Sequence, residues 1–353
     1  MLLATACSSR PDAKGESVET VRSALVDGGA PASGANEYSV FVAGPTPGAG
    51  RMKPAMVFDS KNRVSLVFGG YALGGALAET WEYDGAWTQR CTGDSCQGTP
   101  AARHAAPLAY VPDRSVAVLY GGSTGAGALL CDTWEWASDG RTWTSKSAPT
   151  CSDASVTSRT AHSMAGFGSK AVAFGGLVST GGGAPLRTND ISAWDGQNWS
   201  SLCDKDCAGD PLPAPRAYSS LVHAHLSRGD VLWVFGGNAL PAGSDTGQLV
   251  SDLWEFDVAT SRWTERCTSA ACKASAPAAR AEHGAAFDSV RGRLFVQGGC
   301  RNAACSGAAF DDAYEYDPGA DLWSSVPRVV GAGLPQGRAD LAAVFDGARG
   351  RVV

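Results

Sequence analysis

A pair of adjacent glycines occurs five times in this chain, each time at the end of a short apolar run. Each pair is followed by a glycine-rich stretch, then by an acidic and aromatic segment such as ETWEYD, and then by a lone tryptophan. The order recurs about every 50 to 60 residues, a period that indicates an array of like supersecondary units. The pairs are Gly69-Gly70, Gly121-Gly122, Gly175-Gly176, Gly236-Gly237 and Gly298-Gly299, and the tryptophans are Trp87, Trp143, Trp199, Trp263 and Trp323.

One unit holds enough sequence for four short strands. After Arg103 come HAAPLAYVPDR, closed by a Pro-Asp turn, then SVAVLYGG, the alternating DTWEWAS, and TWTS after an Asp-Gly turn. A four-stranded sheet cannot bury both its faces alone, whereas packing such sheets around an axis covers the faces and leaves only short edges. The sequence therefore predicts an all-β propeller. The alternative, a linear β-solenoid, uses much shorter coils.

The glycine pair, the aspartate-aromatic segment and the spaced tryptophan resemble kelch repeats, which occur in kelch proteins and in the galactose oxidase superfamily. The resemblance covers residues 51–353 and implies a kelch-type propeller of four-stranded blades. It includes an arginine near the start of each unit: Arg51, Arg103, Arg159, Arg216, Arg280 and Arg338. We expect five complete blades, a partial sixth, and a ring completed by residues beyond this chain. The predicted blades are 51–102, 103–158, 159–215, 216–279, 280–337 and the partial 338–353.

Composition argues against nucleic acid as a partner. The net charge is -6, and the chain has no Lys/Arg cluster or basic stripe. The 44 glycines and 11 tryptophans suit tight turns and aromatic packing between blades. We expect a monomer.

Ten of the 11 cysteines fall into local pairs, which favours disulfides formed in an oxidising compartment. In the chain-entropy model, closing such short loops stabilises by roughly 2 to 3 kcal/mol each. Zinc binding would need two pairs to meet at one site, and free thiols in a cytosolic protein are a further alternative. The predicted disulfides are Cys91-Cys96, Cys131-Cys151, Cys203-Cys207, Cys267-Cys272 and Cys300-Cys305.

The remaining cysteine, Cys7, closes the opening MLLATAC, which resembles the end of a bacterial lipoprotein signal. We expect residues 1–7 to be such a truncated signal with Cys7 lipidated, residues 8–36 to be a flexible tether, and residues 37–353 to form the propeller. EYSVFVAGP at 37–45 could supply an outer strand for a closing blade. The expected location is the outer membrane or cell surface, otherwise the periplasm or the exterior, with the lipid as the sole membrane attachment. A chance match at Cys7 is the alternative.

The resemblance to galactose oxidase raises a copper oxidoreductase as an alternative function. In that relative, two tyrosines and two histidines hold copper, and one tyrosine is crosslinked to a cysteine; this chain has no adjacent Tyr-His pair. His104, His162 and His283 follow the unit arginines, where kelch repeats often carry a structural histidine. His223 and His225 alternate on one predicted strand and share a face, so they are candidate metal ligands or inward-packed side chains.

Other chemistry is sparse. The acidic cluster Asp311, Asp312, Asp317 and Asp321 is a candidate calcium site or a solvated turn. The acids of the DTWEW-type segments recur in every unit, which indicates a structural role, since a catalytic residue is needed once. The chain has no G-x-S-x-G, no H-E-x-x-H and no phosphate-binding loop.

The sequence therefore predicts a non-catalytic scaffold that needs no cofactor and binds a protein or glycan ligand, by analogy at the level of the fold. A structural module that supports a further C-terminal domain is another alternative. Strand order places the loops between second and third strands, and the connectors between units, on one face. Rigid loops on a fixed scaffold concentrate recognition. The candidates in the loops are Tyr71, Arg187, Asn238, Arg301 and Asn302.

Overall fold

The structure is a computed structural model that describes residues 51–91, 98–146, 157–181, 183–203, 207, 211–243, 246–327 and 337–353. The chain divides into two compact units, residues 1–36 and 37–353, and every described residue belongs to the second. The predicted signal, tether and closing strand, and Cys7, Cys96 and Cys151, lie outside the described residues.

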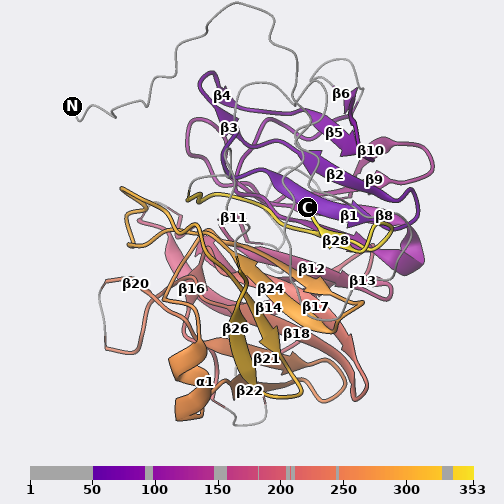
Figure 1. Cartoon of the computed structure of the whole chain (residues 1–353). Coiled ribbons are helices and arrows are strands. Elements are labelled where there is room, and N and C mark those ends of the chain that lie inside the picture. The colour runs from indigo at the N-terminus through magenta and orange to yellow at the C-terminus, as the bar shows by residue number, and fades with distance from the viewer. Residues whose placement is uncertain are drawn as a thin grey trace, which may run out of the picture. The chain divides into compact units, whose positions relative to one another are not determined.

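Five antiparallel sheets follow one another along the chain, and each places four main strands in sequence order (Figure 1). This confirms the predicted all-β propeller class. We call the sheets blades one to five. Blade one contains β1 (Ala55–Asp59), β2 (Val64–Phe68), β5 (Thr80–Tyr83) and β6 (Trp87–Cys91). Blade two contains β7 (Leu108–Val111), β8 (Val116–Tyr120), β9 (Thr133–Ala137) and β10 (Thr142–Ser145). Blade three contains β12 (Ser163–Phe167), β13 (Lys170–Val178), β14 (Leu186–Trp194) and β15 (Trp199–Ser201). Blade four contains β17 (Ser220–Leu226), β18 (Gly229–Phe235), β21 (Leu253–Asp257) and β22 (Arg262–Arg266). Blade five contains β23 (Gly284–Asp288), β24 (Arg293–Gln297), β25 (Ala313–Asp317) and β26 (Leu322–Ser325).

Smaller elements join these blades. The hairpin of β27 (Phe345–Asp346) and β28 (Arg351–Val352) begins a sixth blade, which we call blade six. The loops carry β3 (Tyr71–Ala72), β4 (Gly75–Ala76), β11 (Arg159–Thr160), β16 (Arg216–Ala217), β19 (Asn238–Ala239) and β20 (Gln248–Leu249). The helices among the described residues are η2 (Pro112–Arg114) and α1 (Ala270–Ser275). In the described segments, no helix has the length and apolarity needed to cross a membrane.

Five of the six unit arginines, those of blades one to five, form an ion pair that ties the start of the blade to its third strand. Arg103 donates to both carboxylate oxygens of Asp132 at 2.6 and 2.7 Å and to the carbonyl of Gly121. The indole of Trp134 donates to the same carboxylate. Equivalent pairs are Arg51 with Glu79, Arg159 with Asp190, Arg216 with Asp252 and Arg280 with Asp312. The repeated acids are therefore structural, as their recurrence indicates.

The glycine pairs are required where one blade meets the next. Gly69 has a φ of 63° and Gly70 a φ of 102°, backbone conformations that side chains disfavour. A Cβ on Gly69 would lie 2.5 Å from the carbonyl oxygen of Arg103 in the next unit. The amide of Gly70 donates to that same carbonyl. The pair thus allows adjacent units to approach closely through their backbones.

Aromatic rings fill the space between blades. In blades two to five, the tryptophan of the fourth strand packs on the second-strand aromatic of the preceding blade, with ring centroids 4.6 to 5.4 Å apart. These pairs are Phe68 with Trp143, Tyr120 with Trp199, Phe174 with Trp263, and Phe235 with Trp323. The indoles of Trp143 and Trp199 also donate to threonine hydroxyls of the preceding blade. In blades two to five the lone tryptophan of the repeat therefore joins blades, and its burial stabilises the contact. Trp87 of blade one packs instead on Tyr83 of its own blade.

The innermost segments form a closed circle of backbone hydrogen bonds. The residues that follow each unit arginine by two positions all have φ between 50 and 59°. Each donates its amide to the carbonyl of its counterpart in the preceding unit, and Lys53 completes the circle by donating to Asp340. The members are Lys53, Ala105, Ala161, Tyr218, Glu282 and Asp340. Six units thus surround the axis, although blade six contributes a hairpin alone among the described residues.

Candidate binding face and axial site

The loops that join second to third strands leave the blades at the same end as the circle of backbone hydrogen bonds. We call this end the loop face. It comprises residues 71–79, 123–131, 179–181, 183–188, 238–243, 246–250 and 300–311, together with the residues of the circle. In four blades the glycine pair follows the second strand directly and begins the loop, whereas Gly175 and Gly176 lie within β13 of blade three, where the register shifts.

Four side chains of the circle form a charged cluster on the axis. The Nζ of Lys53 lies 3.0 Å from Oε1 of Glu282 and 3.5 Å from Oδ1 of Asp340. The same ammonium stands 4.8 Å from the centre of the Tyr218 ring, a distance suited to a cation–π contact. A cavity of about 140 Å³ opens over this cluster and is also lined by His162 and His283. Sequence reasoning missed this cluster. Aligning the six units and comparing the residues two positions after each unit arginine would have found it.

Burial sets the protonation of the groups around the cavity. Burial and the neighbouring Asp340 carboxyl raise the pKa of Glu282 to about 7, against the opposing effect of Lys53. Burial, helped by the charge of Arg159, lowers the pKa of His162 well below its ordinary value. Neither ring nitrogen of His162 has a hydrogen-bond partner within the described segments. The imidazole of His162 is therefore neutral near pH 7 and available for a hydrogen bond from the cavity.

Two of the five predicted loop residues, Arg187 and Asn238, take part in contacts that link neighbouring loops, and a third, Asn302, braces its own loop. Arg187 of blade three donates to the backbone carbonyl and the side-chain oxygen of Asn238 in blade four, both at 3.1 Å. The amide of Asn238 in turn donates to the carbonyl of Ala303 in blade five at 3.5 Å. That loop folds on itself, since Asn302 bonds to both the amide and the carbonyl of Ser306. The structure thus joins loops from three blades into one connected rim.

The other two predicted loop residues pack against neighbouring rings. Tyr71 is half-buried in β3, with its ring edge-on to His104 at 5.3 Å. Arg301 lies over the ring of Phe310 at 4.3 Å. Aliphatic side chains nearby are more accessible: Leu73, at the tip of the β3–β4 hairpin, is 98% exposed, and Leu186 in β14 is 58% exposed. The apolar surface offered by this face is therefore aliphatic.

The cysteine pairs lie in the loops and connectors. Cys203 is bonded to Cys207, Cys267 to Cys272 and Cys300 to Cys305. Cys91 and Cys131 are also disulfide-bonded, and their predicted partners are outside the described residues. Disulfides of this number favour an exported protein.

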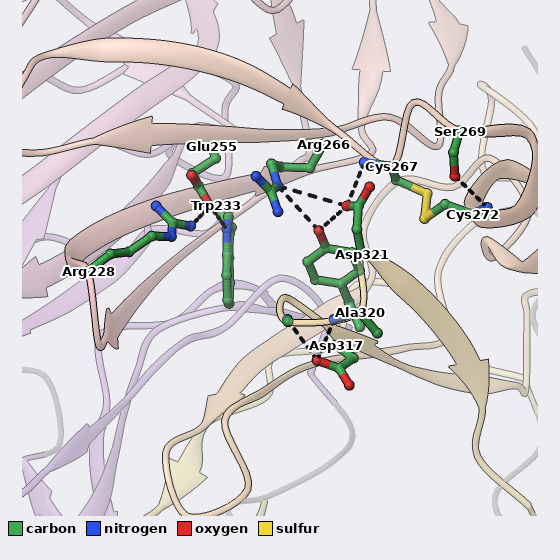
Figure 2. Close-up of polar contacts among 12 residues, drawn as sticks. Arg228, Trp233, Glu255, Arg266, Cys267, Ser269, Cys272, Asp317, Ala320 and Asp321 are labelled. Atoms are coloured by element: carbon green, nitrogen blue, oxygen red, sulfur yellow. Dashed lines mark hydrogen bonds and ion pairs between the residues drawn. A yellow bond between two sulfur atoms is a disulfide. The ribbon is translucent and has the colours of Figure 1, made fainter.

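The connector that holds Cys267 and Cys272 is fastened to the next blade (Figure 2). Ser269 caps α1 by accepting the amide of Cys272, and the amide of Cys267 donates to Asp321 at 3.0 Å. Asp321 belongs to the β25–β26 turn, which strand order assigns to the opposite face from the connectors. This disulfide therefore braces a contact between blades four and five and does not simply stiffen the loop face.

The predicted metal candidates are engaged in other contacts. His223 Nε2 and His225 Nδ1 both lie within 2.9 Å of Oδ1 of Asp230 on the paired strand. Among the described residues, these three are not gathered closely enough to form a metal-binding group.

The acidic cluster is dispersed, so the calcium interpretation is wrong. Asp312 pairs with Arg280, Asp317 caps its own turn, and Asp321 accepts the amide of Cys267. These acids are neighbours in the sequence, but in the structure each of the three carboxylates contacts a different partner.

Comparison with known proteins agrees with this architecture. The KLHDC2/KLHL20/DRC7 Kelch-repeats domain matches residues 67–272, more than half of the chain, and a Kelch motif matches residues 283–329. The chain belongs to the kelch-repeat family. It is also 32% identical over 103 residues to "Multiple epidermal growth factor-like domains protein 8" of Rattus norvegicus, Mus musculus and Homo sapiens. That match covers 29% of this kelch chain and 3% of each relative, so it concerns a small part of those proteins.

Proposed function

We propose that this protein is a non-catalytic scaffold that binds a protein partner on its loop face. Kelch-repeat domains are generally scaffolds of this kind, and the family is established for more than half of the chain. The observation that carries the proposal is the connected rim of Arg187, Asn238 and Ala303, which fixes loops of three blades before any partner arrives. Loops that are ordered in advance lose less conformational entropy on binding.

The chemistry of the loop face suits a protein more than a glycan. Leu73, Leu186 and Met52 are exposed aliphatic side chains, which bind by burying apolar surface. The axial cavity adds a polar centre, where the neutral His162 and the Lys53 cluster could accept one side chain of the partner. An apolar rim around a few placed polar groups is the usual composition of a specific binding site.

Point substitutions test the binding face with little effect on the fold. We expect Leu73→Asp and Leu186→Asp to abolish crosslinking to partner proteins that the wild-type chain captures, measured by quantitative mass spectrometry. Val290→Asp is the matched control, because Val290 is 74% exposed in the β23–β24 turn at the opposite end of its blade. All three variants should unfold within a few degrees of wild type.

Replacement of whole loops is a coarser version of the same test. Grafting short turns over residues 179–188 and 238–250 should also remove binding, but it deletes Asn238, which is buried within the rim. Loss of crosslinking with Val290→Asp and its retention with both leucine variants would place the binding site on the other face.

We also propose that the chain is exported and held at a bacterial membrane by a lipid on Cys7. The disulfides support export, and MLLATAC supports the anchor. Cys7→Ser should shift the protein from the membrane fraction to the soluble fraction and remove incorporation of labelled fatty acid. Fatty-acid labelling that survives Cys7→Ser would refute the anchor without affecting the binding proposal.

A further inference from the structure

A carboxylate stands directly against a disulfide at the edge of the axial cluster. Oε2 of Glu282 lies 2.9 Å from the sulfur of Cys305 and 3.1 Å from the sulfur of Cys300. The three ligand atoms lie within 4.8 Å of one another, and this is the one such group of three in the described part of the chain. A disulfide sulfur carries no proton, so neither sulfur can donate to Glu282 in the oxidised form.

Backbone pairing places all three residues. Cys300 follows Gly299 and pairs with Ala281 in an antiparallel bridge, which sets Cys300 beside Glu282. The amide of Cys305 donates to the carbonyl of Asn302, which turns the loop back over the same point. Glu282 is fixed in turn by the circle of backbone hydrogen bonds. The arrangement therefore comes from the scaffold and not from chance side-chain rotamers.

We propose that reduction of the Cys300–Cys305 disulfide creates a zinc site made of the two cysteine thiolates and the Glu282 carboxylate. A dithiol or phosphine reductant breaks the S–S bond by supplying two electrons, and solvent supplies two protons to the sulfurs. Zinc then displaces these two protons as it binds the thiolates. In the reverse direction a small-molecule disulfide oxidant accepts two electrons from the thiolates and is itself reduced to two thiols, which re-forms the protein disulfide and releases the metal.

The charges and ligand types fit zinc. Two thiolates and one carboxylate around Zn²⁺ leave a net charge of about -1 on the site. Lys53 balances this charge, since its Nζ lies 3.0 Å from the other oxygen of Glu282. Thiolate ligands select zinc over calcium or magnesium. Three protein ligands leave the fourth coordination position of the zinc ion free. Solvent can reach this position, because the ligand Cys305 is exposed.

Small movements of the two sulfur atoms make room for a zinc ion. Tetrahedral zinc with bonds of about 2.1 to 2.3 Å holds its ligand atoms about 3.6 Å apart. The sulfurs must therefore withdraw about 0.5 to 0.7 Å from the carboxylate, and they must also separate from each other, from bonding distance to about 3.6 Å. Cys300 is buried whereas Cys305 is exposed in the loop 300–311, so the movement falls on Cys305.

The inference does not depend on the proposed binding function, and it is tested with zinc alone. The full chain is partly reduced with a phosphine under anaerobic conditions, equilibrated with zinc, desalted and analysed for bound metal and for its thermal transition. Reduced wild type should hold about one zinc ion more than the reduced Cys300→Ser/Cys305→Ser variant. Oxidised wild type should hold none at this site.

Two further variants separate this site from the other cysteines and from unfolding. Cys267→Ser/Cys272→Ser is the matched control and should bind zinc as wild type does, because its carboxylate neighbour Asp321 bonds a backbone amide. Glu282→Gln keeps both thiols and should weaken zinc binding at least about tenfold, with a folded thermal transition. Equal zinc in wild type and the Cys300→Ser/Cys305→Ser variant, or unchanged affinity in Glu282→Gln, would overturn the proposal.

Discussion

At the scale of single residues, the repeated network of arginine, acid and tryptophan explains why the same residue types recur in every blade. Arg216 is fully buried and donates to Asp252, to Gly236 and to Ala214. Removing one member of such a pair leaves a buried charge without compensation, which costs about 3 to 5 kcal/mol. The pair is thus retained as a unit, and its function is to join the start of a blade to its third strand.

The tryptophans that donate to these acids provide the first prediction. Trp254→Ala should lower the free energy of unfolding by about 3 to 5 kcal/mol, because Trp254 is buried. Trp134→Ala should cost less, because Trp134 is half-buried. Trp254→Phe keeps an aromatic ring but removes the indole N–H that donates to Asp252. It should restore most of the free energy of unfolding that Trp254→Ala loses. Urea unfolding measures all three, and equal losses for Trp254→Ala and Trp134→Ala would contradict the burial argument.

The buried histidine of the cavity provides a prediction about pH. His162 has a pKa well below 6.5 in the folded state, because of burial and the charge of Arg159. Below pH 6.5 the unfolded chain therefore binds a proton that the folded chain does not, so stability falls as the pH decreases. His162→Gln should flatten this decline below pH 6.5, as measured by unfolding at several pH values. His225→Gln is the control, since His225 is exposed, and an unchanged slope in His162→Gln would disprove the assignment.

At the scale of elements, the strands within one repeat can be predicted from sequence, whereas contacts between residues of different repeats cannot. The four strands of each blade were predictable, because strand alternation and turn residues lie within a few positions of one another. The axial cluster was not predictable, because its members come from four different units and none lies in a recognisable motif. They are Lys53, Tyr218, Glu282 and Asp340. The calcium interpretation failed for the opposite reason, since Asp312 and Asp321 are close in sequence but point to different blades. The small sheet of β16, β19 and β20 also escaped prediction, because its two-residue strands carry no alternation.

The connector between blades four and five tests what a disulfide contributes to an element. Cys267→Ser/Cys272→Ser should lower the free energy of unfolding by about 2 kcal/mol, the chain-entropy value for so short a loop. Amide exchange in α1 should also accelerate, because Ser269 then caps the helix without covalent support. Ser269→Ala removes the cap alone and should cost about 1 kcal/mol. An unfolding midpoint equal to that of wild type in the double variant would show that Asp321 alone holds the connector.

At the scale of the whole molecule, the ring depends on the seam between blade six and blade one. Arg349, in the β27–β28 turn, donates to Asp346 in its own turn and to the backbone carbonyls of Arg63 and Asp84 in blade one. Arg63 donates back to the carbonyl of Ala348 at 3.4 Å. Elsewhere, buried tryptophans join consecutive blades, so this seam relies more on exposed polar contacts. It is therefore where we expect the ring to open first.

Arg349→Ala tests this expectation. The substitution removes the guanidinium that bridges the two blades, and amides of β1, β27 and β28 should exchange about tenfold faster, equivalent to about 1.4 kcal/mol of local stability. Arg291→Ala is the matched control, because Arg291 occupies the equivalent turn of blade five and contacts Asp288 and Glu315 within its own blade. That control should leave exchange in β1 unchanged, since its contacts lie away from the seam. Hydrogen exchange read by mass spectrometry distinguishes the two. If Arg349→Ala instead accelerated exchange equally in all blades, the ring would open cooperatively, and the circle of backbone hydrogen bonds around the axis would be the element that limits its opening.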